Sequence, residues 1–235
     1  MARSSKSGWF GQHPAERLAD ADSVVVLGLG RFGRSLAREL VKSGTEVLGI
    51  DADEDVVQSL NGVLTHVVRA DTTKDEVLRQ LAVPEYDRAV VGIGSNLEAS
   101  ILTTSLLLKY DNIEIWAKAI GNPHAEILRQ LGVPHVIRPE HDMGKRVAHL
   151  VRSTIQDYIE VESGFVMIRR TAPAEYLGVP LGTSDLRPKY DVTIVAVRTA
   201  AGNWSYASNT TVLAPDDTII VAGQVAKAEA FARLR

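Results

Sequence analysis

One stretch of the chain decides the fold: Ser23-Val24-Val25-Val26-Leu27-Gly28-Leu29-Gly30-Arg31-Phe32-Gly33. Its first five residues are mostly β-branched and apolar, which predicts a buried strand, and a helix is predicted over 31–43. The glycines between them follow the spacing G-x-G-x-x-G. The first allows a tight turn, the second lets a diphosphate approach the backbone, and the third lets the helix pack on the strand. The helix N-terminus then offers N–H groups and a partial positive charge to an anion.

Two residues indicate which kind of ligand this turn is expected to bind. Asp51 ends the next predicted strand, 21 residues after Gly30, which is the distance typical of an acid that binds ribose hydroxyls. A carboxylate there would repel a 2′-phosphate, so NADP is disfavoured. Arg31 follows the second glycine, where its guanidinium is expected to reach phosphates and to sense their number. The alternative is that Arg31 is an ordinary exposed residue of the first helical turn.

Predicted strands and helices continue to alternate up to about residue 142. Short apolar runs predict strands over 23–27, 46–50, 65–68, 88–93, 113–117 and 135–137. Segments of helical period between them predict helices over 31–43, 54–61, 74–82, 96–109 and 123–131. Strands that alternate with helices are typical of βαβ units and a parallel sheet covered on both faces. The expected fold class is therefore α/β, with a Rossmann-like doubly wound sheet.

The pattern changes near the middle of the chain and predicts a second, smaller α+β domain. A helix is expected over about 143–155, strands over 165–168, 193–197 and 218–221, and a last helix over 225–234. The expected organisation is a flexible arm over 1–21, a nucleotide-binding domain over 22–141, a linker helix over 142–157 and the second domain over 158–235.

Composition excludes several classes of protein. The chain has 235 residues, with 26 Lys and Arg against 29 Asp and Glu, and no cysteine. Disulfides, thiolate metal sites and thiol nucleophiles are therefore excluded, and we expect an intracellular protein. The near balance of charge leaves no basic face for nucleic acid. No apolar run approaches the roughly 20 residues that a membrane-spanning helix needs.

Catalytic patterns are missing from the sequence. No GxSxG, HExxH or paired-carboxylate motif is present, and no histidine has a recognisable catalytic setting: His13, His66, His124, His135, His141 and His149. An NAD-dependent oxidoreductase remains the alternative to a non-enzymatic protein. A third hypothesis, a dinucleotide-sensing transcription factor, would need a DNA-reading element within the first 21 residues or the second domain.

Several motifs together resemble one known family. They are the glycine stretch through Leu36, Ile50-Asp51, Arg69-Ala70-Asp71-Thr72, the residues from Gly94 to Ser100, Trp116-Ala117-Lys118-Ala119 and the residues from Arg138 to Gly144. Over residues 22–224 the chain is similar to regulatory subunits of bacterial Trk/Ktr potassium-uptake systems, which are built from an RCK (regulator of potassium conductance) domain. The resemblance implies a cytoplasmic homodimer that assembles into an octameric ring. Such a ring docks on the inner face of a membrane potassium transporter and gates uptake according to bound ATP or ADP, or NAD or NADH.

The resemblance also implies roles for individual residues. The phosphates would be held by Gly28, Gly30, Arg31, Phe32 and Gly33, and the ribose by Asp51. Asp71, preceded by Ala70, would lie beside the adenine. Thr72 belongs to the same motif, and the loop Gly94-Ser95-Asn96 would close the crevice. Lys118 matches a lysine near the phosphates.

Glu140 has two interpretations. In the family, a glutamate in this stretch helps to hold a cation, Mg²⁺, Ca²⁺ or Na⁺, beside the nucleotide phosphates of a neighbouring subunit, and such ions take oxygen ligands. The alternative is that Glu140 or Asp142 caps a helix that begins near Met143.

A second ligand is implied in the second domain. Arg187, Lys189 and Tyr190 resemble a family segment where some members bind c-di-AMP between paired domains. Pro188 departs from the small residue expected there. The alternative is a plain dimer interface, with the Arg/Lys pair solvated on a turn.

Overall fold

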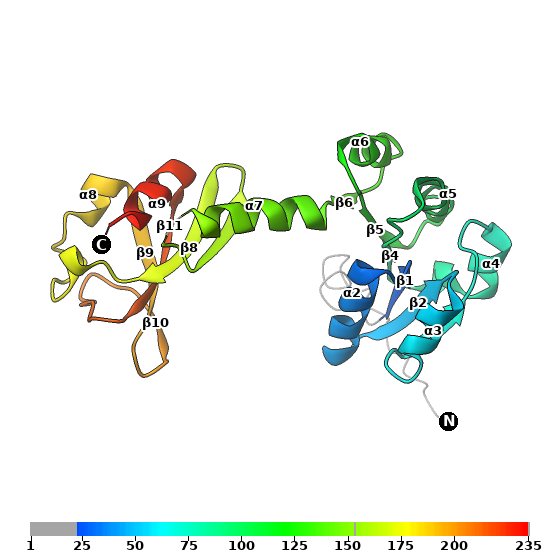
Figure 1. Ribbon diagram of the computed structural model, residues 1–235, viewed down its shortest axis with the longest axis horizontal. Helices are drawn as coiled ribbons and strands as arrows, with labels where there is room; N and C mark the ends of the chain where they lie inside the picture. Colours follow the sequence, from blue (N-terminus) through cyan, green and yellow to red (C-terminus); the bar gives the residue numbers. More distant parts are fainter. Residues whose placement is uncertain (1–22, 153, 235) are drawn as a thin grey trace, which may run out of the picture. The chain divides into compact units, whose positions relative to one another are not determined.

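The computed structural model describes residues 23–152 and 154–234. The predicted arm over 1–21 lies outside the described residues. The chain divides into two compact units, one that ends at Glu140 and one that begins at His141 (Figure 1). Among the described helices, none is long and apolar enough to span a bilayer.

The first unit is built on a six-stranded parallel sheet. Its strands are β1 (Ser23–Leu27), β2 (Glu46–Asp51), β3 (His66–Arg69), β4 (Arg88–Val91), β5 (Glu114–Lys118) and β6 (His135–Ile137). Their order is β3-β2-β1-β4-β5-β6, and every neighbouring pair is parallel. The predicted doubly wound α/β fold is confirmed. The strand order reverses between β1 and β4, which is where open α/β sheets bind ligands.

Helices cover both faces of this sheet, as expected because β1 is apolar and buried from Val24 to Leu27. They are α2 (Arg31–Lys42), α3 (Glu54–Leu60), α4 (Asp75–Gln80), a 3₁₀ turn (Val83–Glu85), α5 (Leu97–Leu107) and α6 (Asn122–Gln130). Val24 and Val26 pack into one apolar core, beneath α2 and α3. Val25 and Leu27 pack into the other, with residues of α4, α5 and α6.

The helix expected over about 143–155 begins and ends earlier, as α7 (Pro139–Val151). Proline is favoured in the first turn of a helix, where its missing N–H has no partner to lose. The helix ends because Ile155 is buried in the second core and the Gln156 N–H donates to Arg169 O at 2.7 Å, which draws the chain into a sheet. Glu140 and Asp142 therefore lie inside the helix, so the prediction that one of them caps it near Met143 is wrong.

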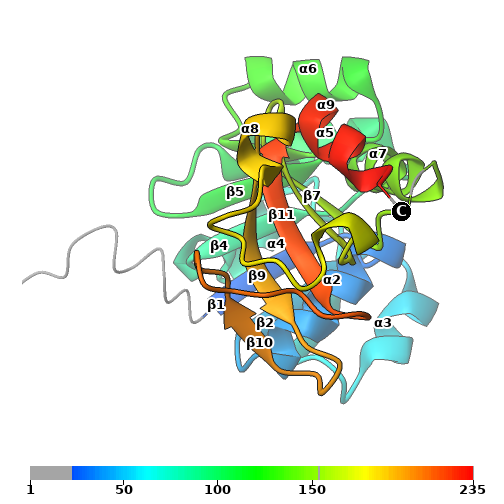
Figure 2. The ribbon, with the colours of Figure 1, turned by 90° about the vertical axis from the view of Figure 1, so that its left-hand side faces the viewer.

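The second unit is an antiparallel sheet with helices at one end (Figure 2). Its order is β10-β9-β11-β8-β7, with β7 (Asp157–Glu162), β8 (Phe165–Thr171), β9 (Val192–Arg198), β10 (Trp204–Tyr206) and β11 (Thr218–Gln224). A 3₁₀ turn (Ala174–Tyr176), α8 (Leu186–Tyr190) and α9 (Val225–Ala232) complete it. The stretch expected to be a turn at 187–190 is the short helix α8, which packs against α9 through Tyr190 and Phe231.

A buried arginine fixes the end of α9. Arg170 is 4% exposed, and its guanidinium donates to Phe231 O at 2.7 Å and Leu234 O at 2.8 Å. Phe231 lies in the last turn of α9, where carbonyls lack the usual helical partner, and Leu234 lies two residues beyond the end of the helix. Arg170 thus joins both the last turn and the segment after it to the sheet. The guanidinium also lies over the Phe231 ring, 5.5 Å from its centroid. Arg170 is thus part of the structural core of the second unit.

Candidate functional site

Two glycines, Gly28 in the loop after β1 and Gly33 in α2, are required by the packing of the chain itself. Gly28 has a φ of +93°, and a Cβ on it would lie 2.7 Å from the Ile93 backbone nitrogen. A Cβ on Gly33 would lie 2.0 Å from Gly28 O. Any side chain at either position would push α2 or the loop after β4 out of place. Gly28 and Gly33 are therefore needed for the close packing of the loop, α2 and the segment after β4.

Gly30 is different, because nothing in the described chain requires it to be glycine. Its φ is −61°, which any residue adopts, and a Cβ on it would have no atom within 4 Å. The space in front of Gly30 is therefore open, at the N-terminus of α2. Free backbone N–H groups and the helix dipole make such a position favourable for an anion.

Asp51 ties the glycine loop to the end of β2. The Leu29 N–H donates to Asp51 Oδ2 at 2.6 Å, and the Asp53 N–H donates to Asp51 Oδ1 at 3.0 Å. Both carboxylate oxygens therefore have a backbone partner, which fixes the side chain. Each oxygen keeps further acceptor capacity, because a carboxylate offers about four lone-pair positions.

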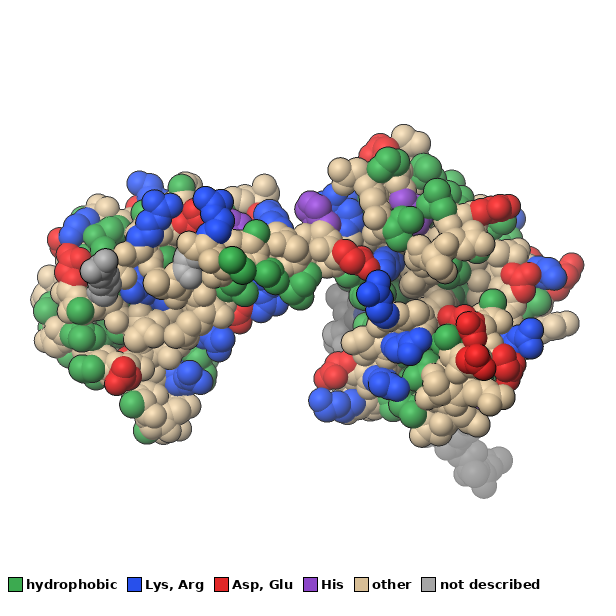
Figure 3. All heavy atoms as spheres, in the orientation of Figure 1, with side chains coloured by type: hydrophobic (Ala, Val, Ile, Leu, Met, Phe, Trp, Pro, Cys, Tyr) green, Lys and Arg blue, Asp and Glu red, His purple; other side chains and the backbone are tan. Residues whose placement is uncertain are grey.

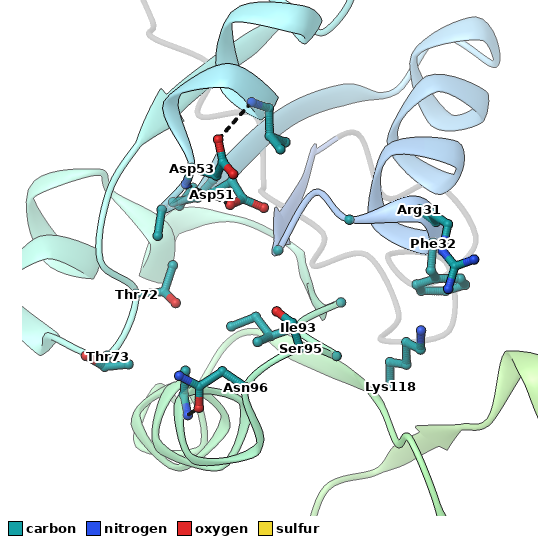
Figure 4. A pocket seen from close by; sticks show the side chains of 18 of the residues that line it. Arg31, Phe32, Asp51, Asp53, Thr72, Thr73, Ile93, Ser95, Asn96 and Lys118 are labelled. Atoms are coloured by element: carbon teal, nitrogen blue, oxygen red, sulfur yellow. Dashed lines mark hydrogen bonds between the residues drawn. The ribbon is translucent and has the colours of Figure 1, made fainter.

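A cleft of about 810 Å³ opens beside this loop. Small-molecule sites commonly have volumes of about 300–1,000 Å³. Figure 4 shows Arg31 and Phe32 at the start of α2 on one side, with Lys118 beneath them, and Asp51 and Asp53 on the opposite side. The cleft is lined by every residue predicted for the nucleotide except Gly33, namely Gly28, Gly30, Arg31, Phe32, Asp51, Ala70, Asp71, Thr72, Gly94, Ser95, Asn96 and Lys118, and also by Glu140.

Charge is divided across the cleft. Figure 4 shows Arg31 and Lys118 on one side of the cleft and Asp51 and Asp53 on the opposite side. Basic side chains also gather over α2, and acidic ones over α3, on the face in Figure 3. Within the described parts of the chain, the Arg31 guanidinium forms no hydrogen bond or ion pair. An anionic group at one end and hydroxyl donors at the other would match this distribution.

Lys118 is paired with Glu140. The Lys118 ammonium donates to Glu140 Oε1 at 2.6 Å and lies 5.7 Å from the centroid of the Phe32 ring. The hydrogen bond from Lys118 holds the pKa of the Glu140 carboxyl below its usual range, and the charge of Arg31 adds to this effect. No group of three or more metal-ligating side chains occurs among residues 23–152 and 154–234. A cation at this site would therefore have one side-chain ligand, Glu140, and one oxygen of that carboxylate is already bonded to Lys118. Its further ligands would have to come from the nucleotide or from another subunit.

Three other predicted residues have structural partners as well as a place in the cleft. The Thr73 hydroxyl donates to Asp71 Oδ1 at 2.6 Å and holds the pKa of the Asp71 carboxyl below its usual range. Thr72 is buried and shares a hydrogen bond of 2.9 Å with Thr103 of α5. Asn96 caps α5, because its Oδ1 accepts from the Ala99 N–H at 3.0 Å. The Asn96 amide nitrogen and the second lone pair of Oδ1 remain for a ligand.

The sequence interpretation missed several lining residues. Asp53 caps α3, with its Oδ1 accepting from the Asp55 N–H at 2.9 Å, and a capping acid just after Asp51 is a signal that was available. Ile93 and Ile120 also line the cleft, each two residues after the carboxyl end of a strand, β4 and β5 respectively. The remaining ones have no distinctive pattern: Ile50, Ala52, Val56, Thr73, Gly92 and Ala99.

Histidines do not line the cleft within the described residues. His124 is buried in α6, its Nδ1 accepts from the Ile120 N–H at 3.3 Å, and burial lowers the pKa of its imidazole. His135 stacks on Trp116 and bonds to Glu114 at 2.7 Å, away from the cleft. His13 lies outside the described residues.

The residues predicted for c-di-AMP are only partly brought together. Arg187 lines a second cleft of about 460 Å³ in the second unit. The Lys189 ammonium, however, donates to Glu175 at 2.6 Å, and Tyr190 packs edge-on against Tyr176 and Phe231. Binding of c-di-AMP stays a prediction.

Similarity to known proteins covers both units. Residues 24–139 match the TrkA-N domain and residues 165–235 the TrkA-C domain. The chain is 35% identical over 207 residues to Ktr system potassium uptake protein C of Bacillus subtilis, covering 88% of this chain and 94% of that protein. It is 31% identical over 199 residues to Ktr system potassium uptake protein A of Vibrio alginolyticus, covering 84% and 90%.

Solved structures agree on the fold. The GsuK RCK domain superposes with a TM-score of 0.63 at 18% identity, over 92% of this chain and 48% of that one. The GsuK channel bound to NAD gives 0.64 at 17% identity, over 92% and 40%. This chain thus spans less than half of either GsuK chain. With its TrkA-N and TrkA-C domains and its identity to the two Ktr proteins, the chain belongs to the family of Ktr and Trk potassium uptake regulatory proteins.

Proposed function

We propose that this chain binds an adenine nucleotide in the cleft between β1 and β4 and thereby regulates a membrane potassium transporter without catalysing a reaction. The observation that carries the proposal is the open approach to Gly30 at the N-terminus of α2, with the unpaired Arg31 beside it. The phosphates would lie there, the ribose at Asp51, and the adenine beside Asp71. The solved GsuK channel, which shares this fold, is described as bound to NAD.

The charged side chains of the site would give ATP and ADP different affinities, because the two ligands differ by one phosphate. Arg31 is exposed and free to move toward a terminal phosphate, whereas Lys118 is held in the floor of the cleft. A third phosphate would add a charge-assisted contact that ADP does not make. A Mg²⁺, Ca²⁺ or Na⁺ ion shared with Glu140 would supply charge neutralisation between such phosphates.

The partner is inferred from the family. Because the relatives are potassium uptake proteins, we infer that this chain docks on a membrane potassium transporter at the cytoplasmic side, as a homodimer that assembles into an octameric ring. A nucleotide can shift such an assembly only by binding its two shapes with different affinities. ATP and ADP would therefore favour different shapes of the ring.

Calorimetric titration of ATP and ADP into the whole chain tests the proposal. Arg31→Ala is expected to weaken ATP binding about tenfold, the loss of one charge-assisted contact, and to bring the affinities for ATP and ADP together. Arg38→Ala is the matched control, since Arg38 is exposed on the same helix and does not line the cleft. Unchanged affinities of Arg31→Ala for both nucleotides would refute the role of Arg31.

A further inference from the structure

Two segments that line the cleft come from different halves of the first sheet. Residues 70–73 follow β3, whereas Asn96 and Ala99 belong to the start of α5, which follows β4. Figure 4 shows Thr72 and Asn96 on neighbouring sides of the cleft. Strands β2 and β1 lie between β3 and β4, so no strand pairing fixes the distance between the two segments. Contacts between the segments themselves therefore help to set that distance.

A buried hydrogen bond joins the two segments. The hydroxyl oxygens of Thr72 and Thr103 lie 2.9 Å apart, and the two residues are 7% and 0% exposed. Asn96, Ala99 and Thr103 are spaced by three and four residues, so they lie on one face of α5. Thr103 thus stands one helical turn beyond the part of α5 that lines the cleft, and it does not line the cleft itself.

No other hydrogen bond within the described residues joins this loop to α5. The Ala70 N–H donates to Asp51 O at 2.9 Å, and the Thr73 hydroxyl donates to Asp71 Oδ1 at 2.6 Å. Both of these bonds stay within the half of the sheet that contains β1, β2 and β3. The bond between the two threonine hydroxyls is therefore the polar link that holds the loop at a defined distance from the helix.

The short distance between the two oxygens matters for a flat ligand. Carbon atoms in contact lie about 3.5–4.0 Å apart, so an apolar pair in place of the hydroxyls would move the loop and α5 apart by roughly 0.6–1.1 Å. A gap of about 0.5–1 Å already removes a quarter to a half of the dispersion attraction between two atoms. An adenine ring held between the loop and α5 would lose that fraction of its attraction to one of the two walls.

We infer that Thr103 is a positioning residue for adenine: its hydroxyl holds Thr72 and thereby fixes the width of the space between residues 70–73 and α5 that receives the base. This inference rests on the proposed nucleotide site and concerns how that site recognises the base. Gly30 and Arg31 serve the phosphates instead. The effect of Thr103 is therefore expected to be the same for every ligand that carries adenine.

Calorimetric titration of ATP and ADP into three variants tests the inference. Valine keeps the β-branched shape of threonine and removes the hydroxyl. Thr103→Val is therefore expected to bind both nucleotides about threefold to tenfold more weakly than the unmodified chain, by the same factor for each. Thr103→Ser keeps the hydroxyl and is expected to retain the affinity. Thr104→Val is the matched control, because Thr104 is also 0% exposed on α5 and its hydroxyl has no hydrogen-bond partner within the described chain.

A double variant separates positioning from stability. Removing one hydroxyl leaves its buried partner unsatisfied and lowers stability, whereas replacing both partners by apolar groups of the same shape is nearly neutral. Thr72→Val/Thr103→Val is therefore expected to unfold in urea like the unmodified chain, yet to bind ATP as weakly as Thr103→Val. Helix α4 keeps its own link to the segment after α5 in every variant, because the Tyr110 hydroxyl donates to Asp75 Oδ1 at 2.8 Å.

Four outcomes would overturn the inference. They are an unchanged affinity of Thr103→Val, an equal loss in Thr103→Ser or in Thr104→Val, a loss for ATP that differs from the loss for ADP, and recovery of the affinity in the double variant. The last outcome would give the bond a purely structural role. Failure of the proposed nucleotide site is distinguishable, because the unmodified chain would then bind neither nucleotide.

Discussion

Replacing Gly30 by alanine distinguishes an effect on ligand binding from an effect on the stability of the fold. A methyl group at Gly30 meets no atom of the described chain within 4 Å, and the backbone there already has a φ that alanine adopts. We therefore expect the free energy of unfolding of Gly30→Ala to stay within about 1 kcal/mol of the unmodified value, the scale of a change at a helix N-cap. The methyl group would instead stand where the diphosphate is expected to approach.

The loss of affinity can be bounded. Hydrogen bonds to charged groups contribute about 1.5–3 kcal/mol, and each 1.4 kcal/mol is tenfold in affinity. Blocking one such contact is thus expected to weaken ATP binding about tenfold to 100-fold, measured by calorimetry. Gly33→Ala is the contrasting variant. Its Cβ would lie 2.0 Å from Gly28 O, and overpacking of this kind destabilises by about 1–3 kcal/mol or more.

Urea unfolding without ligand and ATP titration together decide the question. The reasoning would be refuted if Gly30→Ala bound ATP like the unmodified chain, since the open space would then have no role in binding. It would also be refuted if Gly30→Ala unfolded as easily as Gly33→Ala.

Two further predictions concern the second unit. Arg170→Met is expected to lower the free energy of unfolding of this unit by about 2–4 kcal/mol, because the buried Phe231 carbonyl and the part-buried Leu234 carbonyl each lose a charged donor. Urea unfolding measures this, and Lys227→Met on the exposed face of α9 is the control. A loss no larger than the control's would contradict the prediction. The hydrogen bond from Arg146 holds the pKa of the Asp157 carboxyl below its usual range. Stability from this pair is therefore present above about pH 4 and lost as the pH falls through the lowered pKa. Arg146→Ala should be less stable near pH 7 and lose less on acidification to pH 2; parallel pH profiles of the two proteins would exclude this contribution.

The fold of the first unit was predictable because local signals agreed with one another. Gly28 and Gly33 are required by the turn and by helix packing, so their spacing marks the β1–α2 unit in this sequence. The candidate site followed from that unit, since Asp51 at the end of β2 reaches the glycine loop directly.

Other features were not predicted, one because it joins residues distant in sequence and the rest for local reasons. The pairing of Lys118 with Glu140 joins residues 22 positions apart, and neither pattern nor spacing marks it. Asn96 was predicted as a ligand residue, whereas its oxygen caps α5. Strand β7 was missed because three of its six residues are acidic and its apolar residues do not alternate strictly with polar ones. Strand β10 was missed because it is only three residues long at a sheet edge. The start of α7 was placed late because Pro139 was not considered as its first residue.

Thermal unfolding of the whole chain with ATP, ADP, AMP, NAD, NADH and c-di-AMP tests the central claim most directly. A ligand that binds only the folded state raises the apparent stability by about 2.7 kcal/mol at one hundred times its dissociation constant. The account predicts that at least one adenine nucleotide raises the unfolding temperature, and that Gly30→Ala reduces this rise without lowering the unfolding temperature of the ligand-free protein. No rise with any adenine nucleotide would contradict it.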